Sequence, residues 1–427
     1  MQQNALERDI QMTELPNGVR VITEPMPAVR SVAAGFWIGT GSRCETPKTN
    51  GISHFIEHML FKGTPARSAE QIAREMDSIG GNLDAFTGRD LAGYTMKVLD
   101  EHLDFAFGIL ADMLKNPRFD EADIEKEKGV ILEELKMEND DPEEVVHDLF
   151  IHNSWKGHPL GMPIIGTGRT IRSFNEKVLR AHHRRHYCAA NLLVTAAGNL
   201  RHDRVIELVK RHLDGLPPGA PEPEQPVPGF QPPFELKSRR ALQQLQLCLG
   251  TPMIEAAHPL RLACFTLNVI LGGSMSSRLF QNIREQQGLA YSIFSELNLY
   301  RDTGSLGIYA GTSPENGRRV LDSTLAELRR LREEPVPEDE LRRAREHMKG
   351  SLLLSLESTT SRMSNLARQW MTHGRFFTLD ELAHEIDGVT ADQIQHVARE
   401  YFQPGKIGLA ALGRVDSLGL SQGDLIC

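Results

Sequence analysis

The stretch Gly51-Ile-Ser-His-Phe-Ile-Glu-His-Met-Leu-Phe-Lys-Gly-Thr64 determines how the rest of the chain is interpreted. Its start and stop signals predict a single helix. Asn50 is the expected N-cap, and Gly63 followed by Pro65 is expected to end the helix.

Three polar side chains of this helix form the pattern H-x-x-E-H. His54 and His58 are four residues apart, so their imidazoles lie on one face and can converge on one point. Two neutral imidazoles at this spacing suit zinc, and the neighbouring Glu57 suits a general base acting on water at the metal. Histidines four apart on a half-apolar helix also occur as ordinary surface or core residues. The motif therefore needs a third ligand.

The residues around the motif resemble the inverzincins of the pitrilysin, insulinase and mitochondrial-processing-peptidase family of zinc metallopeptidases. The resemblance rests on Gly51-Ile-Ser53, on H-x-x-E-H itself and on Met59-Leu-Phe-Lys-Gly-Thr64. The family pattern adds a glutamate about seventy-five residues further on. Glu134 stands 134 − 58 = 76 positions after His58. The resemblance implies that His54, His58 and Glu134 bind one Zn²⁺ per chain.

A second helix is predicted from about residue 120 to residue 138. Its apolar stripe consists of Ile124, Ile131 and Leu135. Glu127 and Glu134 lie two turns apart on that stripe, where an unpaired carboxylate facing a core is costly. A partly buried stripe with solvated acids would also explain the pattern. The family spacing favours zinc ligation by Glu134. The resemblance implies that Glu127 contacts one of the zinc ligands rather than the zinc itself.

Composition and charge limit the classes of function. The chain has 427 residues, 40% hydrophobic and 25% charged, as in an ordinary globular protein with two or more domains. A net charge of −9 argues against nucleic acid as a partner and suits a basic or neutral peptide. Polar residues interrupt every apolar run, and residues 1–14 show no signal or transit pattern. We therefore expect no membrane association and a cytoplasmic location.

The five cysteines point the same way. They are odd in number and include no C-x-x-C pair, which is typical of a reducing compartment. Zinc binding by thiolates is not expected.

A proline-rich run divides the chain nearly in half. Residues 216–234 cannot hold a helix or a central strand and are expected to form an extended connector. The predicted domains are an N-terminal zinc-binding catalytic lobe (1–215), the linker (216–234) and a C-terminal lobe without metal (235–427).

The second half is predicted to repeat the first. A shift of 217 residues lays the helix at 103–114 on the apolar stretch at 320–331. The same shift puts Glu127 on Ala344 and Glu134 on Ser351, so only the first lobe is equipped for zinc. Paired strands among long helices predict an α+β fold, in which each lobe has a mainly antiparallel sheet with helices packed on it. The resemblance implies the same fold.

The cluster His182-His183-Arg184-Arg185-His186 has two interpretations. It could hold a second metal ion or a phosphate, but its arginines would repel a cation. Basic residues are also common at helix C-termini. We therefore interpret the cluster as a solvated or core-capping face.

The stretch Asn82-Leu-Asp-Ala-Phe-Thr87 resembles the family's edge strand, to which a peptide adds through backbone hydrogen bonds. The resemblance implies that substrate is bound by Asn82, Ala85, Phe86 and Thr87. Asp84 stands where relatives often have asparagine. An ordinary strand of a sheet would show the same pattern.

Arg284 and Tyr291 resemble the family's C-terminal Arg/Tyr pair, which reaches the substrate carbonyl near zinc. Both side chains donate hydrogen bonds suited to an oxygen on which negative charge develops. An arginine and a tyrosine that merely pack locally are the alternative. Larger family members carry four such lobes and this chain has two. The resemblance thus implies a homodimer whose protomers complete each other's clefts.

These observations together predict a zinc-dependent endopeptidase that hydrolyses extended or unfolded peptides in a closed chamber. Glu57 is the predicted general base, with Arg284 and Tyr291 as further catalytic residues. The alternative is a non-catalytic peptide-binding or assembly subunit of the same fold. Such subunits have lost motif residues, whereas all of them are present here.

Overall fold

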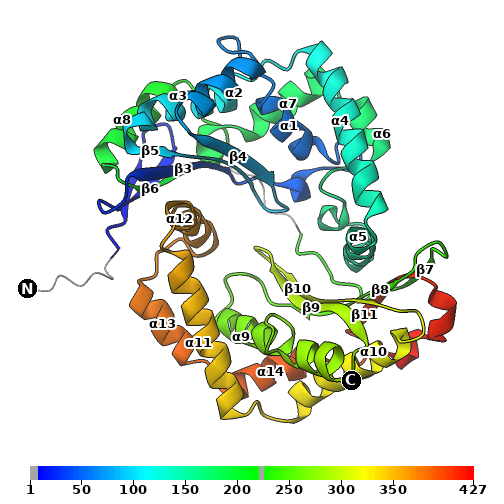
Figure 1. Ribbon diagram of the computed structural model, residues 1–427. Coiled ribbons are helices and arrows are strands. Elements are labelled where there is room, and N and C mark those ends of the chain that lie inside the picture. Colours follow the sequence, from blue (N-terminus) through cyan, green and yellow to red (C-terminus); the bar gives the residue numbers. More distant parts are fainter. Residues whose placement is uncertain (1–7, 221–225) are drawn as a thin grey trace, which may run out of the picture. The chain divides into compact units, whose positions relative to one another are not determined.

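The computed structural model describes residues 8–220 and 226–427, which form two compact units (Figure 1). Unit 1 comprises residues up to 136, 162–225 and 353–379. Unit 2 comprises residues 137–161, 226–352 and 380–427. Each unit is one sheet with helices on its faces.

The sheet of unit 1 has six strands in the order β1-β2-β6-β3-β5-β4. Their bounds are β1 Gln11–Glu14, β2 Arg20–Pro25, β3 Ser31–Ile38, β4 Asn82–Thr87, β5 Ala92–Leu99 and β6 Leu192–Gly198. All neighbouring strands are antiparallel except β2 and β6. The central strands β3 and β6 are buried along almost their whole length because both faces of the sheet are covered.

Most helices of unit 1 come from the first half of the chain. They are α1 Ile52–Leu60, α2 Ala69–Ser78, α3 Leu103–Lys115, α4 Glu121–Asp140, α6 Gly168–Ser173, α7 Glu176–His186 and α8 His202–His212. The main core lies between the sheet and this helical layer, where Phe36 of β3 meets Phe107 of α3 edge-on at 5.0 Å. This layer contains the H-x-x-E-H helix, α1, and the helix that carries Glu134, α4.

Unit 2 repeats the topology of unit 1, as its sheet order β7-β11-β8-β10-β9 shows. The strands are β7 Phe234–Ser238, β8 Leu245–Met253, β9 Ala290–Leu299, β10 Gly304–Thr312 and β11 Gly408–Gly413. In chain order, β7 to β11 correspond to β2 to β6. The pair β7–β11 is parallel, like its counterpart β2–β6, and the other neighbouring strands are antiparallel. The predicted internal repeat and the α+β fold class are confirmed.

The helices of unit 2 are α5 Pro142–Ser154, α9 Arg261–Leu271, α10 Gly317–Glu333, α11 Glu338–Ser355, α13 Leu379–Asp387 and α14 Ala391–Tyr401. The predicted shift of 217 residues matches α3 with α10 and α4 with α11. Ala344, the counterpart of Glu127, is buried in the apolar core of unit 2. A carboxylate at that position would have no ligand to support.

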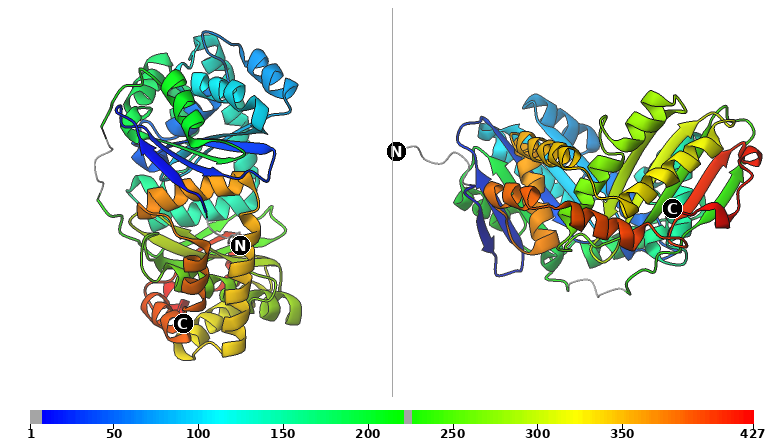
Figure 2. Two further views of the ribbon diagram at one scale, coloured as in Figure 1. Left: turned by 90° about the vertical axis from the view of Figure 1, so that its left-hand side faces the viewer. Right: turned by 90° about the horizontal axis from the view of Figure 1, so that it is seen from below.

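The two halves of the chain exchange one helix each. Helix α12, Thr359–His373, belongs to the second half but covers the face of unit 1's sheet opposite the main core (Figure 2). Helix α5 belongs to the first half but packs on β8 and β11 of unit 2. The helices are counterparts, since 142 + 217 = 359. The compact units therefore differ from the sequential lobes 1–215 and 235–427, because each sheet completes its second face with a helix from the other half.

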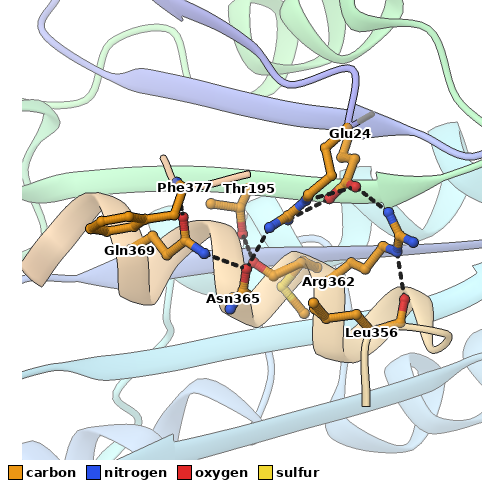
Figure 3. Close-up of polar contacts among 9 residues, drawn as sticks. Glu24, Thr195, Leu356, Arg362, Asn365, Gln369 and Phe377 are labelled. Atoms are coloured by element: carbon orange, nitrogen blue, oxygen red, sulfur yellow. Dashed lines mark hydrogen bonds and ion pairs between the residues drawn. The ribbon is translucent and has the colours of Figure 1, made fainter. Parts of the chain in front are cut away.

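A buried polar network fastens α12 to the sheet of unit 1 (Figure 3). Glu24 of β2 is 1% exposed and pairs with Arg8 at 2.6 Å and with Arg362 of α12. Arg8 also donates to Asn365 at 2.8 Å. A buried carboxylate between two guanidinium groups is stable only while both partners remain, so these contacts specify where α12 lies.

The described parts of the proline-rich connector contain almost no regular secondary structure. Residues 216–220 and 226–233 form neither helix nor strand, and β7 begins at Phe234, the last residue of the predicted linker. The central part of the prediction, residues 221–225, lies outside the described residues. Among the described residues, none of the helices has the length and apolar character needed to span a membrane.

Candidate metal centre

The N-cap of helix α1 is a glycine in the left-handed conformation. Gly51 is the N-cap with φ +89°, and a Cβ there would come within 2.5 Å of a backbone carbonyl oxygen. Asn50 does not cap the helix, because its side-chain amide donates to Glu45 at 3.1 Å and to the carbonyl of Pro163 at 2.8 Å. The predicted N-cap at Asn50 is therefore wrong. The predicted end is confirmed, since α1 stops at Leu60, before Gly63.

The apolar face of α1 anchors it in the core of unit 1. Its fully buried side chains are Ile52, Phe55, Ile56, Met59 and Leu60. His54, Glu57 and His58 occupy the remaining face and are only partly buried. The helix thus presents its three motif residues from a rigidly packed backbone.

The structure brings the three predicted ligands together. His54 Nε2 lies 3.7 Å from Glu134 Oε1, and His58 Nε2 lies 3.6 Å from Glu134 Oε2. One ligand atom from each residue can be chosen so that all lie within 4.8 Å of one another. In the described part of the chain, His54, His58 and Glu134 are the group of histidine, cysteine, aspartate or glutamate side chains that lie close enough together to hold a metal ion.

The donor set and its spacing fit zinc. Two ligands at zinc bond lengths of about 2.0–2.1 Å in tetrahedral geometry are about 3.3 Å apart, close to the distances found. Glu134 Oε2 is buried without a hydrogen-bond partner among the described residues, as expected of an atom that faces a cation. Burial, together with neighbouring His58, lowers the pKa of His54 to about 4. A neutral imidazole offers a lone pair to a metal.

Glu127 is hydrogen-bonded to His58, one of the predicted ligands. Glu127 is 1% exposed, and its Oε1 accepts a hydrogen bond from His58 Nδ1 at 2.8 Å. This contact leaves His58 Nε2 as the nitrogen available to metal. Lys62 Nζ lies 2.6 Å from Glu127 Oε2. Burial raises the pKa of Glu127, but the hydrogen bonds from His58 and Lys62 and the charge of Lys62 outweigh it, so the pKa is lowered overall.

Glu57 lies beside the three ligands without joining them. Its Oε2 accepts a hydrogen bond of 2.5 Å from the Thr87 hydroxyl, which fixes the carboxylate. Burial raises the pKa of Glu57, and the Thr87 hydrogen bond and nearby His58 oppose the rise. A carboxyl group with a raised pKa next to a metal site is a good candidate for moving protons.

The predicted substrate strand β4 forms an edge of its sheet. It pairs with β5 on one side and is the last strand of the six. Asn82 and Phe86 lie on its exposed face, whereas Ala85 and Thr87 lie on the less exposed face. The Thr87 side chain is engaged with Glu57, so any contact it makes with substrate would be through its backbone. Asp84 is exposed.

Arg284 and Tyr291 also come together, in unit 2. Arg284 belongs to a π-helical segment, Phe280–Gln286, and its guanidinium lies 5.5 Å from the ring centre of Tyr291 at the start of β9. Both line a pocket of about 430 Å³, and Tyr291 is 79% exposed. The pair therefore presents hydrogen-bond donors at a surface pocket of unit 2, whereas the three metal ligands belong to unit 1.

The basic cluster at the end of α7 combines both expected roles. Arg184 and Arg185 are exposed, while His183 and His186 are buried. His183 Nε2 donates to the Leu114 carbonyl at 2.8 Å. Burial lowers the pKa of His183 to about 4, which keeps it neutral. The cluster was interpreted as a solvated or core-capping face, and the structure places its arginines in solvent and His183 and His186 against the core.

Two residues of the site have no counterpart in the sequence predictions. Lys62 could have been suspected, because it lies four residues after His58 and one turn further along the same helix face. Glu45 binds the start of α1 from five to eight residues upstream. Capping motifs span about three residues, so no local pattern identifies it.

Two lobes of one topology, with the H-x-x-E-H helix and the distant glutamate in the first alone, define an inverzincin. Comparison with known proteins agrees. Residues 20–168 match the family model described as insulinase (peptidase family M16), and residues 173–348 match the M16 inactive domain. The chain belongs to the M16 peptidase family.

Curated relatives cover nearly the whole chain. An uncharacterized zinc protease of Bacillus subtilis is 42% identical over 390 residues, which are 90% of this chain and 94% of the relative. An uncharacterized zinc protease of Streptomyces coelicolor is 38% identical over 399 residues, 92% and 87% of the two chains. A crystal structure of a protease from Helicobacter pylori superimposes with a TM-score of 0.89 over 95% of this chain and 100% of its own. At 22% identity, that likeness shows a shared fold.

Proposed function

We propose that this protein is a zinc-dependent endopeptidase that hydrolyses extended or unfolded peptides. The observation that carries the proposal is the convergence of His54, His58 and Glu134, with Glu57 held beside them by Thr87. When bound, zinc supplies a Lewis acid with an open position and lowers the pKa of water towards about 7. The names of the relatives support the choice of zinc and of peptide bonds.

Glu57 is the residue that moves the proton. Its carboxylate accepts the proton of the attacking water and passes it to the departing amine nitrogen. Thr87 keeps one carboxylate oxygen fixed, so the other is free to take part. The raised pKa brings this carboxyl group closer to neutral pH, where proton transfer in both directions is efficient.

The edge strand β4 holds the substrate in an extended conformation. The side of β4 that faces away from β5 has backbone groups available for a peptide to add as a further strand. Arg284 and Tyr291 stabilise the negative charge that develops on the scissile carbonyl oxygen. Asn82, Ala85 and Phe86 complete the proposed peptide-binding strand.

The test compares one peptide sequence in two conformations. A fluorescence-quenched peptide should be cleaved, whereas the same sequence within a stably folded helix should be spared because it cannot add to β4. The matched control is a destabilised variant of the domain that contains this helix, and it should be cleaved. Efficient cleavage inside the stable helix would contradict strand addition. Binding of the peptide without any cleavage would indicate the alternative, a non-catalytic binding subunit.

We further propose that two copies of the chain share their sites, with Arg284 and Tyr291 of one protomer serving the zinc site of the other. A Glu57→Gln protein mixed with an Arg284→Ala/Tyr291→Phe protein should then regain activity, because one of the two clefts in each heterodimer is intact. Subunit exchange is verified with differently tagged chains. Proven exchange without recovery would show that each chain completes its own site.

A further inference from the structure

The first turn of α1 lacks a cap from its own sequence. The first N–H groups of a helix have no partner within the helix, and a neighbouring side chain normally accepts from them. Gly51 stands at the N-cap and has no side chain to do so. A carboxylate from outside the helix, Glu45, takes this place.

Glu45 accepts three hydrogen bonds at this point. Its Oε2 accepts from the backbone N–H of Gly51 at 2.7 Å and from the side-chain amide of Asn50 at 3.1 Å. Its Oε1 accepts from the backbone N–H of Ser53 at 2.9 Å. Ser53 immediately precedes His54, so the contact reaches the backbone that carries the first metal ligand.

The surroundings of Glu45 give the contact its importance. The side chain is 3% exposed, and among the described residues no lysine or arginine pairs with it. A buried carboxylate without a cationic partner is costly unless N–H donors satisfy it. The positive end of the helix dipole and three donors provide that compensation here. Asn50 also bonds to the carbonyl of Pro163, so the carboxylate links two loops to the helix.

We propose that Glu45 is a positioning residue of the metal centre, which fixes the first turn of α1 so that His54 meets Glu134. The expected effect of Glu45 on zinc binding rests on the proposed zinc function, whereas the hydrogen bonds that Glu45 makes do not depend on it. His54 lies in this first turn, whereas His58 lies one turn further on and is held by Glu127. Loss of the Glu45 carboxylate would therefore displace His54 more than His58.

The decisive variant is Glu45→Gln, which keeps the size of the side chain but turns one acceptor oxygen into an NH₂ donor facing N–H groups. The matched control is Asp141→Asn, because Asp141 caps α5 of unit 2 by accepting from Glu143 N–H at 2.9 Å. Burial raises the pKa of Glu45 to about 7 against the opposing hydrogen bonds from Ser53 and Gly51. The measurements are therefore made at a pH of about 8.5, where the carboxylate is ionised.

Two readouts separate positioning from a general loss of stability. In the metal-free protein, amide hydrogen exchange across residues 50–56 should speed up in Glu45→Gln and stay unchanged in Asp141→Asn. Zinc affinity in a chelator competition should fall by about 10-fold or more in Glu45→Gln alone, as is typical when a ligand loses its support. The visible absorption of the cobalt-substituted protein should change in parallel, since it reports ligand geometry.

The outcomes distinguish this proposal from the proposed function. Unchanged exchange at residues 50–56 in Glu45→Gln, or wild-type zinc affinity and cobalt spectrum, would overturn the role of Glu45 and leave the zinc function standing. A wild-type protein that binds no zinc would instead refute the proposed function. If Glu45→Gln does not fold, Glu45→Asp serves, because it keeps the charge at a shorter reach. A zinc affinity of Glu45→Asp that is measurable but lower than that of the wild type supports the proposal. An affinity equal to that of the wild type contradicts it.

Discussion

Glu57→Gln is expected to lower kcat for peptide hydrolysis by at least about 10²-fold, the usual contribution of a general base, while zinc stays bound. Glutamine has the same shape and can still accept the hydrogen bond from Thr87, so the site should keep its structure. It cannot accept the proton of the attacking water. Because Glu57 is not one of the three converging ligands, its loss leaves the metal set complete.

The measurement is steady-state cleavage of a quenched peptide together with the zinc content of the same preparation. KM should change little, because we propose that β4, rather than Glu57, holds the substrate. The matched control is Glu70→Gln, a surface glutamate of α2 that pairs with Arg74 and should be as active as the wild type. Cleavage by Glu57→Gln at the parental rate would show that another group is the base.

Glu134→Gln should lose both zinc and activity. The carboxylate contributes a charged ligand atom close to His54 and His58, and the neutral amide that replaces it is a poor zinc ligand. Zinc affinity should fall by more than the roughly 10–100-fold that the loss of a supporting hydrogen bond costs. Peptide cleavage should fall to background in the same preparation.

The neighbouring residue provides a matched control for this experiment. Glu133 lies on the same helix, but its side chain is 69% exposed and pairs with Lys136 at 2.6 Å. Glu133→Gln should therefore bind zinc and cleave peptide as the wild type does. Zinc retained at wild-type affinity in Glu134→Gln would mean that the third ligand is a different residue.

The sequence was most informative where the physics is local. The helical spacing of Ile124, Ile131 and Leu135 predicted α4, and the stop signal at Gly63 and Pro65 predicted the end of α1; the structure confirms both. Glu134 was recognisable as a candidate zinc ligand because an unpaired carboxylate on an apolar helix face is costly. Its spacing from His58, which matches that of the family, then favoured zinc ligation.

The sequence was less informative where a contact joins distant segments. The exchange of α5 and α12 depends on which sheet face each helix meets, and helical periodicity carries no such information. The wrong N-cap at Asn50 has the same origin. A local rule favoured asparagine, whereas the cap comes from Glu45 across a left-handed turn at Gly51.

The central claim is tested most directly by following peptide cleavage through removal and return of zinc in the unmodified protein. We predict one zinc ion per chain, cleavage that falls in proportion to zinc as a chelator removes it, and full recovery when one equivalent is restored. Full cleavage by a protein shown to be free of metal, or no cleavage by a fully zinc-loaded protein, would contradict the account.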